Sequence, residues 1–215
     1  LSLLKLTREG PISKSLVSID ARIPVQVIRD ILQRISDDGL IQLGDKKIQT
    51  SPNQRVKIAI RAIGLGADSE KVCRPLRWDE FENFTAIAFQ ANNFTIRKRF
   101  RFKHGGRGWE IDLIGCKEPI VACVDCKHWR HGWGKSASAK AVEAQIKRTK
   151  ALASMHSMHP RLGLASWRKA MFVPMILSSI PAPAKFHMKA PIVPILQLQD
   201  FLNELPAYMS SLEHF

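Results

Sequence analysis

Two apolar segments that carry charged residues, 109–115 and 121–127, constrain the fold of this chain most strongly. Both have the composition of β-strands, in which side chains two residues apart share a face. Asp125 and Lys127 are therefore predicted to point to the same side of one strand, and the strand before it carries Asp112. Buried charges are costly unless they are paired or bind a metal. We therefore expect a divalent metal site with a lysine next to it.

The charge of the chain indicates a polyanionic partner. Its 215 residues include 33 Lys and Arg against 19 Asp and Glu, a net charge of +14 at pH 7. Such an excess favours nucleic acid or an anionic membrane. No apolar run approaches the roughly 20 residues that span a bilayer, the start does not have the pattern of a secretory signal, and the four cysteines do not indicate an oxidising compartment. We expect a cytoplasmic protein with reduced thiols that binds no membrane; the motifs described below then favour DNA as the partner and a nucleoid-associated location.

Residues 1–66 predict a small α+β domain of the winged-helix type. Three short helices, the third with apolar residues at helical spacing from Val25 to Ile35, precede a hairpin at 40–49. Such modules place the third helix in the major groove and the hairpin on the DNA backbone. The DNA contacts expected from the third helix and the hairpin tip are Arg29, Arg34, Lys46 and Lys47. Dimerisation or packing between domains is the alternative, because a fold does not fix a function.

After a linker at 67–75, residues 76–215 predict a second domain of the α/β class. Helical periodicity and strand-like segments alternate along it, which is typical of a sheet covered by helices. We expect helices at about 79–91, 137–155 and 198–204, and strands at 94–103, at the two charged segments, and near 170–177 and 192–196.

The order of the charged motifs resembles the PD-(D/E)xK nucleases, the restriction-endonuclease-like superfamily. The resemblance is closest to its Mrr-type and archaeal Holliday-junction-resolvase-like branch. An acidic residue on the first helix, Glu82 with Glu80 as the alternative, is followed by Asp112 and then by the triplet 125–127 and a helix with Gln145. The resemblance covers roughly residues 76–205. The chain departs from the family pattern in having an isoleucine, in place of proline, before the first aspartate.

The resemblance implies a restriction-endonuclease-like core, a mixed central sheet flanked by helices, and a Mg²⁺- or Mn²⁺-dependent deoxyribonuclease, expected to be an endonuclease of DNA repair, recombination or restriction. The catalytic residues that it implies are Glu82, Asp112, Asp125, Lys127 and Gln145. The metal ligands would be the carboxylates of Glu82, Asp112 and Asp125 and the backbone carbonyl of Cys126. Hard oxygen ligands of this kind suit Mg²⁺. A homodimer is compatible with the resemblance.

Lys127 would orient the attacking water and stabilise the charge that develops on the phosphate, and Gln145 would position Lys127 or a phosphate. Two alternatives remain open. In the first, the charged residues form a structural ion-pair network in a non-catalytic DNA-binding or recruitment protein. In the second, the chain is a winged-helix transcription regulator with an unrelated effector domain, which leaves the Asp-x-Lys strand unexplained.

Further cations and aromatic residues lie beside the charged strands. Cations on one side of strand 94–103, a basic glycine turn and a tryptophan-rich loop suit contacts with phosphates and bases. The DNA contacts expected there are Arg99, Arg101, Lys103, Arg107, Trp129, Arg130 and Lys135. For Trp129, packing in the core is the alternative.

Cys123 and Cys126, with His128 and His131 nearby, have a spacing that could suggest zinc. On a strand, however, residues three apart face opposite sides, and a structural zinc site needs four ligands. We therefore do not expect zinc here.

Overall fold

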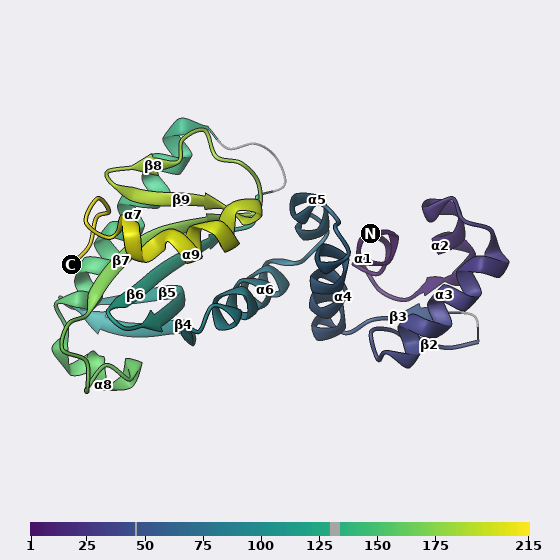
Figure 1. Ribbon diagram of the computed structural model, residues 1–215, viewed down its shortest axis with the longest axis horizontal. Coiled ribbons are helices and arrows are strands. Elements are labelled where there is room, and N and C mark those ends of the chain that lie inside the picture. The colour runs from purple at the N-terminus through teal and green to yellow at the C-terminus, as the bar shows by residue number, and fades with distance from the viewer. Residues whose placement is uncertain (46, 130–133) are drawn as a thin grey trace. The chain divides into compact units, whose positions relative to one another are not determined.

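The computed structural model describes residues 1–45, 47–129 and 134–215, so the predictions for Lys46, Arg130 and His131 lie outside the described residues. These residues form two compact units, Leu1–Phe84 and Thr85–Phe215, called here the N-terminal and the C-terminal unit. Figure 1 shows the order of the elements along the chain. Within the described ranges, no helix is long and apolar enough to cross a membrane.

The N-terminal unit begins with the predicted arrangement of three helices followed by a hairpin. The serine at position 13 caps the second helix by accepting a hydrogen bond from the amide of Leu16, and Ile28, Leu32 and Ile48 are buried between the helices and the small sheet. A short strand before the second helix, absent from the prediction, pairs with the second strand of the hairpin. The elements are α1 (Ser2–Leu6), β1 (Ile12–Ser13), α2 (Lys14–Ala21), α3 (Val25–Asp37), β2 (Gln42–Leu43) and β3 (Lys47–Gln49).

Three further helices follow in the chain. A capping box formed by Ser51 and Gln54, with a proline in the first turn, starts the first of them. The segment 67–75, expected as a linker, contains a short helix whose residues Val72 and Cys73 are fully buried. The helices are α4 (Pro52–Gly64), α5 (Ser69–Cys73) and α6 (Trp78–Ala91), and α6 continues into the C-terminal unit.

The C-terminal unit is built on a six-stranded mixed sheet with the order β4-β5-β6-β7-β9-β8. Strand β5 pairs antiparallel with both β4 and β6, whereas β6, β7 and β9 run parallel, and β8 is antiparallel to β9. The predicted α/β class with a mixed sheet flanked by helices is confirmed. The strands are β4 (Thr95–His104), β5 (Arg107–Lys117), β6 (Ile120–Lys127), β7 (Met171–Ser178), β8 (Phe186–His187) and β9 (Ala190–Pro194); the helices are α7 (Lys135–Ala153), α8 (His159–Leu162) and α9 (Leu198–Tyr208).

Helices cover both faces of this sheet. On one face, Leu152 of α7 packs with Cys123 of β6 and Phe172 of β7 in one buried cluster. On the other, Phe89 at the end of α6 lies so close to Gly115 of β5 that a Cβ added there would approach the ring to 2.8 Å. β6 lies between β5 and β7, and both of its faces are covered. A charged side chain near its end, such as Asp125, is therefore buried.

Candidate active site

The end of β6 carries the first two charged residues of the site. Asp125 is buried, with 4% of its surface exposed, and Lys127 is half-buried. The Lys127 Nζ lies 2.7 Å from Oδ2 of Asp125. The prediction that both side chains share a face of the strand is therefore confirmed, because this distance is that of a direct ion pair.

Asp112 of β5 lies next to this pair. The β5–β6 ladder ends with the pair Leu113 and Val124, and Asp112 and Asp125 are the next residues on the two strands beyond it. The Oδ2 of Asp112 accepts a hydrogen bond from the backbone amide of Cys126 at 2.8 Å. Burial raises the pKa of Asp112, and the negative charge of Asp125 raises it further, against the opposing effects of that hydrogen bond and of the nearby cations. The charged form of Asp112 is thus disfavoured beside the charge of Asp125.

The backbone is distorted at the position opposite Asp112 on the other side of β5. Arg99 of β4 has φ 50°, whereas its neighbours keep the register by pairing with Leu113 and Ile111. This conformation costs a non-glycine residue on the order of 1 kcal/mol. On β5, Ile111 and Ile114 pack in the same cluster although they are three residues apart, so the alternation of faces changes between them. The backbone is thus irregular near Asp112 both on β4 and on β5. Strained or irregular backbone is common at functional sites.

Helix α7 adds Gln145 and Arg148, a cation that the sequence placed beside Gln145 as a possible DNA contact and not at the carboxylates. Gln145 is 1% exposed and donates a hydrogen bond from Nε2 to the carbonyl of Cys123 at 2.8 Å. The Nη1 of Arg148 lies 3.2 Å from Oδ1 of Asp125 and also 3.2 Å from Oε1 of Gln145. Gln145 was expected to position Lys127 or a phosphate, but in the structure it holds Arg148 against Asp125. The i, i+3 spacing of the two residues was the only signal in the sequence.

The acidic residue expected on α6 belongs to the N-terminal unit. Glu82 is buried there, and its proposed role as a metal ligand stays a prediction. The alternative, Glu80, forms a buried ion pair with Arg55 at 2.8 Å and accepts a hydrogen bond from the amide of Arg77 at 2.7 Å. Both oxygens of Glu80 are thus used within the N-terminal unit, and we assign it a structural role.

The donor atoms of the C-terminal unit suit a hard divalent cation. Asp112 and Asp125 offer carboxylate oxygens at adjacent strand positions. Among the residues that the structure describes, no three His, Cys, Asp or Glu side chains are grouped so that they could hold a metal. Mg²⁺ is commonly held by one or two carboxylates and completes its shell with water and substrate phosphate. The two aspartates therefore fit Mg²⁺ or Mn²⁺ better than an ion that needs a complete protein cage, and the role of the Cys126 carbonyl stays a prediction.

The cations predicted to contact DNA from the C-terminal unit lie mostly on its surface. Arg101 forms an ion pair with Glu110 across the strands at 2.6 Å, and the Arg107 guanidinium lies 4.4 Å from the centre of the Trp109 ring. The others, exposed on β4 and at the start of α7, are Arg99, Lys103 and Lys135. Trp129 is half-buried and packs against a cluster that includes Val142 and Ile176, so the packing alternative describes this ring.

In the N-terminal unit, the predicted DNA contacts Arg29 and Arg34 are exposed on α3, and Lys47 is exposed on β3. The same helix also exposes apolar residues, among them Val27 and Ile31. Its surface is therefore of mixed character, compatible with DNA and with a protein partner alike.

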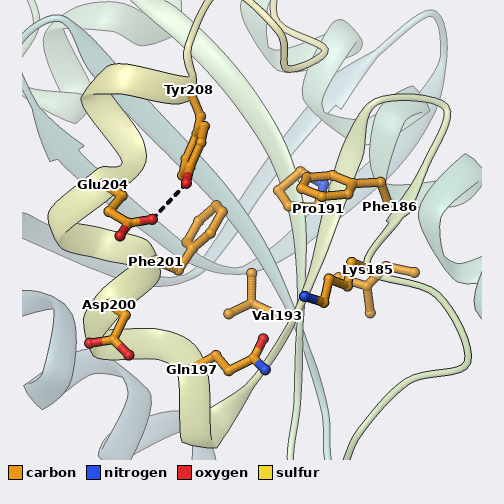
Figure 2. A pocket seen from close by; sticks show the side chains of 10 residues that line it. Lys185, Phe186, Pro191, Val193, Gln197, Asp200, Phe201, Glu204 and Tyr208 are labelled. Atoms are coloured by element: carbon orange, nitrogen blue, oxygen red, sulfur yellow. Dashed lines mark hydrogen bonds between the residues drawn. The ribbon is translucent and has the colours of Figure 1, made fainter.

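Among the pockets that described residues form on the surface of the C-terminal unit, two differ clearly in charge. One, of about 220 Å³, lies between β5 and α7 and is lined by Arg107, Trp109, Lys140, Glu143, Ala144, Lys147 and Arg148. The other, of about 400 Å³, lies between α9 and the segment 185–193, and Figure 2 shows Tyr208 hydrogen-bonded to Glu204 at its rim. Asp200 and Glu204 oppose a single lysine in that second pocket, so it does not suit a polyanion. The first pocket does, and it shares Arg148 with the carboxylate site.

The chain is similar to several proteins of unknown function. No family model matches the chain. An uncharacterized protein of Archaeoglobus fulgidus is 28% identical over 136 residues, which are 63% of this chain and 96% of that protein. Among solved structures, the protein of unknown function AF1548 is 12% identical with a TM-score of 0.32, over 45% of this chain and 44% of that one. Protein VC1899 from Vibrio cholerae is 11% identical with a TM-score of 0.38, over 86% and 43%. The chain spans less than half the length of either solved protein, and scores at this level carry no functional argument.

Proposed function

We propose that this protein is a Mg²⁺- or Mn²⁺-dependent deoxyribonuclease that hydrolyses phosphodiester bonds, with Asp112, Asp125 and Lys127 at its centre. The proposal rests chiefly on one observation. Two carboxylates lie side by side at the edge of the core, with a lysine 2.7 Å from the more deeply buried one, and the negative charge of Asp125 contributes to the raised pKa of Asp112. A purely structural network rarely puts two like charges together, whereas a site for a divalent cation requires them.

The residues present match what hydrolysis of a phosphodiester needs. When bound, the divalent cation would neutralise phosphate charge and lower the pKa of a water molecule. Asp112 and Asp125 would hold the ion. Lys127, half-exposed and close to Asp125, would orient the attacking water and stabilise the charge that develops on the phosphate oxygens. Arg148 would keep Asp125 in place from the side of α7.

A DNA substrate is supported by the charge of the C-terminal unit, which holds 19 Lys and Arg against 8 Asp and Glu. An excess of positive charge strengthens DNA binding, because the protein cations release counterions from the DNA backbone. A DNA substrate would also imply a cytoplasmic, nucleoid-associated protein, and it is compatible with a homodimer that cuts both strands.

A non-catalytic DNA-binding or recruitment protein is the second candidate, and one observation favours it. Asp125 is already contacted by two cations, Lys127 on Oδ2 and Arg148 on Oδ1. Such a network could serve structure alone. The two candidates differ in one measurable respect. Only a nuclease forms cleaved DNA, and it should stop doing so when Lys127 is removed.

The experiment is cleavage of labelled duplex, single-stranded, flap and four-way-junction DNA in Mg²⁺ or Mn²⁺ and in EDTA. Lys127→Ala is compared with Lys117→Ala, a control that removes an exposed lysine of the same sheet. We expect cutting that needs the metal, is lost in Lys127→Ala and survives in the control. Binding of DNA without cutting by the parent in every condition would favour the non-catalytic candidate. Equal cutting by both variants would show that Lys127 has been wrongly assigned.

A further inference from the structure

The pocket of about 220 Å³ beside the site is strongly positive. Four cations line it, two arginines and two lysines, against the single carboxylate of Glu143. The Oε1 of Glu143 also lies 3.7 Å from Nε2 of His187. Within the described parts of the chain, no ion pair joins Lys140 or Lys147 to an acidic residue. The two lysines are two helical turns apart on α7, so they face the same way and both stay available to a ligand.

A second feature of the pocket is that one of its arginines is held in place by an aromatic ring. The guanidinium of Arg107 lies 4.4 Å from the centre of the Trp109 ring. Trp109 is itself stacked nearly parallel to Phe102, with 6.5 Å between the ring centres, and its Nε1 donates a hydrogen bond to the carbonyl of His104. The indole therefore supports Arg107 and is not a free platform for a nucleobase. A pre-oriented guanidinium loses less entropy when it binds an anion.

The pocket also shares a residue with the carboxylate site. Arg148 lines the pocket and contacts Oδ1 of Asp125 at 3.2 Å. An anion in the pocket is therefore a near neighbour of Asp125. The volume lies below the roughly 300–1,000 Å³ of pockets for drug-sized ligands, which suits a small group such as a phosphate with part of its sugar.

We propose that this pocket binds one phosphate group of a nucleic-acid strand and thereby positions that strand beside Asp112 and Asp125. Arginine forks and lysines are the side chains that recognise phosphate oxygens. The positioning role rests on the proposed nuclease function, whereas the binding of phosphate does not. The phosphate is either the terminal group of a strand or an internal diester, and the two share the same chemistry.

The test is binding of a fluorescent single-stranded oligonucleotide in EDTA, so that no cleavage is needed. The double variant Lys140→Ala/Lys147→Ala is compared with Lys150→Ala/Lys169→Ala, which removes the same charge outside the pocket. We expect the pocket variant to bind at least about tenfold more weakly than the control, with the slope of log K against log salt smaller by about 1. Equal affinity and equal slope in the two double variants would overturn the proposal.

Two arms of the experiment identify the source of the phosphate. If it is terminal, a 5′- or 3′-phosphate strengthens binding to the parent and has no effect on the pocket variant. If it is internal, replacing one diester with a neutral methylphosphonate weakens the parent at one position and leaves the pocket variant unchanged there. A parent protein indifferent to every such change would overturn the proposal. Failure of cleavage alone would count against the nuclease function and leave the phosphate pocket standing.

Discussion

Buried charge is arranged differently in the two units of this molecule. In the N-terminal unit, each of the three side-chain nitrogens of Arg55 has a partner. Its Nε pairs with Glu80 at 2.8 Å, and its Nη atoms donate to the carbonyls of Leu4 and Pro75 and to the Thr7 hydroxyl. In the C-terminal unit, two carboxylates adjoin each other, and the pKa of one of them is raised by its burial and by its neighbour.

The difference separates structural from functional charge. A buried pair contributes to folding only when its geometry and hydrogen bonds are complete, as around Arg55. The aspartates of the C-terminal unit form an arrangement that the fold alone does not need, since removing the charge of Asp112 would relieve its repulsion from Asp125. Residues that lower stability in this way are concentrated at sites selected for chemistry. The surfaces differ as well, because the N-terminal unit has 14 Lys and Arg against 11 Asp and Glu, a far smaller excess than the 19 against 8 of the C-terminal unit.

The largest effect should separate the two charge groups by activity. We expect Asp125→Asn to reduce the rate of metal-dependent cleavage at least about 1,000-fold, which corresponds to about 4 kcal/mol in the barrier. DNA affinity in EDTA should stay within about threefold of the parent, because the substitution removes no cation. Single-turnover cleavage and fluorescence anisotropy measure the two quantities. Cleavage at the parental rate would remove Asp125 from the site.

The next effect concerns stability and falls on the N-terminal unit. Glu80→Gln leaves the buried guanidinium of Arg55 without its counter-charge, and we expect the free energy of unfolding to drop by about 3–5 kcal/mol. Urea denaturation followed by circular dichroism measures it. The matched control is Asp38→Asn, which breaks the exposed ion pair with Arg61 and should cost less than about 1 kcal/mol. If the two variants lose equal stability, the buried pair of Arg55 and Glu80 contributes no more to folding than the exposed pair of Arg61 and Asp38.

Local patterns in the sequence predicted much of this architecture. The shared face of Asp125 and Lys127, the helices at the start of the N-terminal unit and the succession of the main strands and helices along residues 79–204 follow from periodicities of two and of 3.6 residues, which depend on near neighbours only. The pairing of Asp112 with Asp125 also needs the strand register, which the alternating apolar residues specify.

Other features depend on tertiary contacts and left no local signal. The contact between Arg148 and Asp125 is set by how α7 docks on the sheet, and the left-handed backbone at Arg99 by the strands around it. Propensity within a segment says little about either. The short helix α5 was missed because its buried apolar residues, Val72 and Cys73, are adjacent and form no pattern at helical spacing. The partner of Gln145 could be guessed only from its spacing to Arg148.

A smaller effect should distinguish the charge groups by pH. The raised pKa of Asp112 means that its ionisation costs more in the folded protein than in the unfolded chain. The cost is absent below the ordinary value of 3.8 and grows as the pH rises through the folded pKa. Asp112→Asn should therefore stabilise the protein at pH 7, by about 0.5–2 kcal/mol, while its oxygen still accepts the Cys126 hydrogen bond.

The difference in Tm between Asp112→Asn and the parent, measured from pH 3 to pH 7, checks this sign. It should approach zero at the acidic end and be positive at pH 7, whereas Asp200→Asn, on the exposed surface of α9, should show little change. A variant less stable than the parent at pH 7 would mean that Asp112, like Glu80, belongs to a structural network.

The smallest effect concerns the surface ion pair between Arg101 and Glu110. The side chains are 76% and 37% exposed, and such pairs contribute about 0–1 kcal/mol to stability. If Arg101 contacts DNA, Arg101→Ala should weaken binding a few-fold and reduce the salt slope by about 1. Glu110→Ala should do the opposite, because it frees Arg101 from its partner and removes a charge that repels phosphate. Anisotropy titrations at several salt concentrations measure both variants. Were the pair only structural, both variants would lose the same small amount of stability and bind DNA like the parent, and the contrast between the two units would then rest on their buried charges alone.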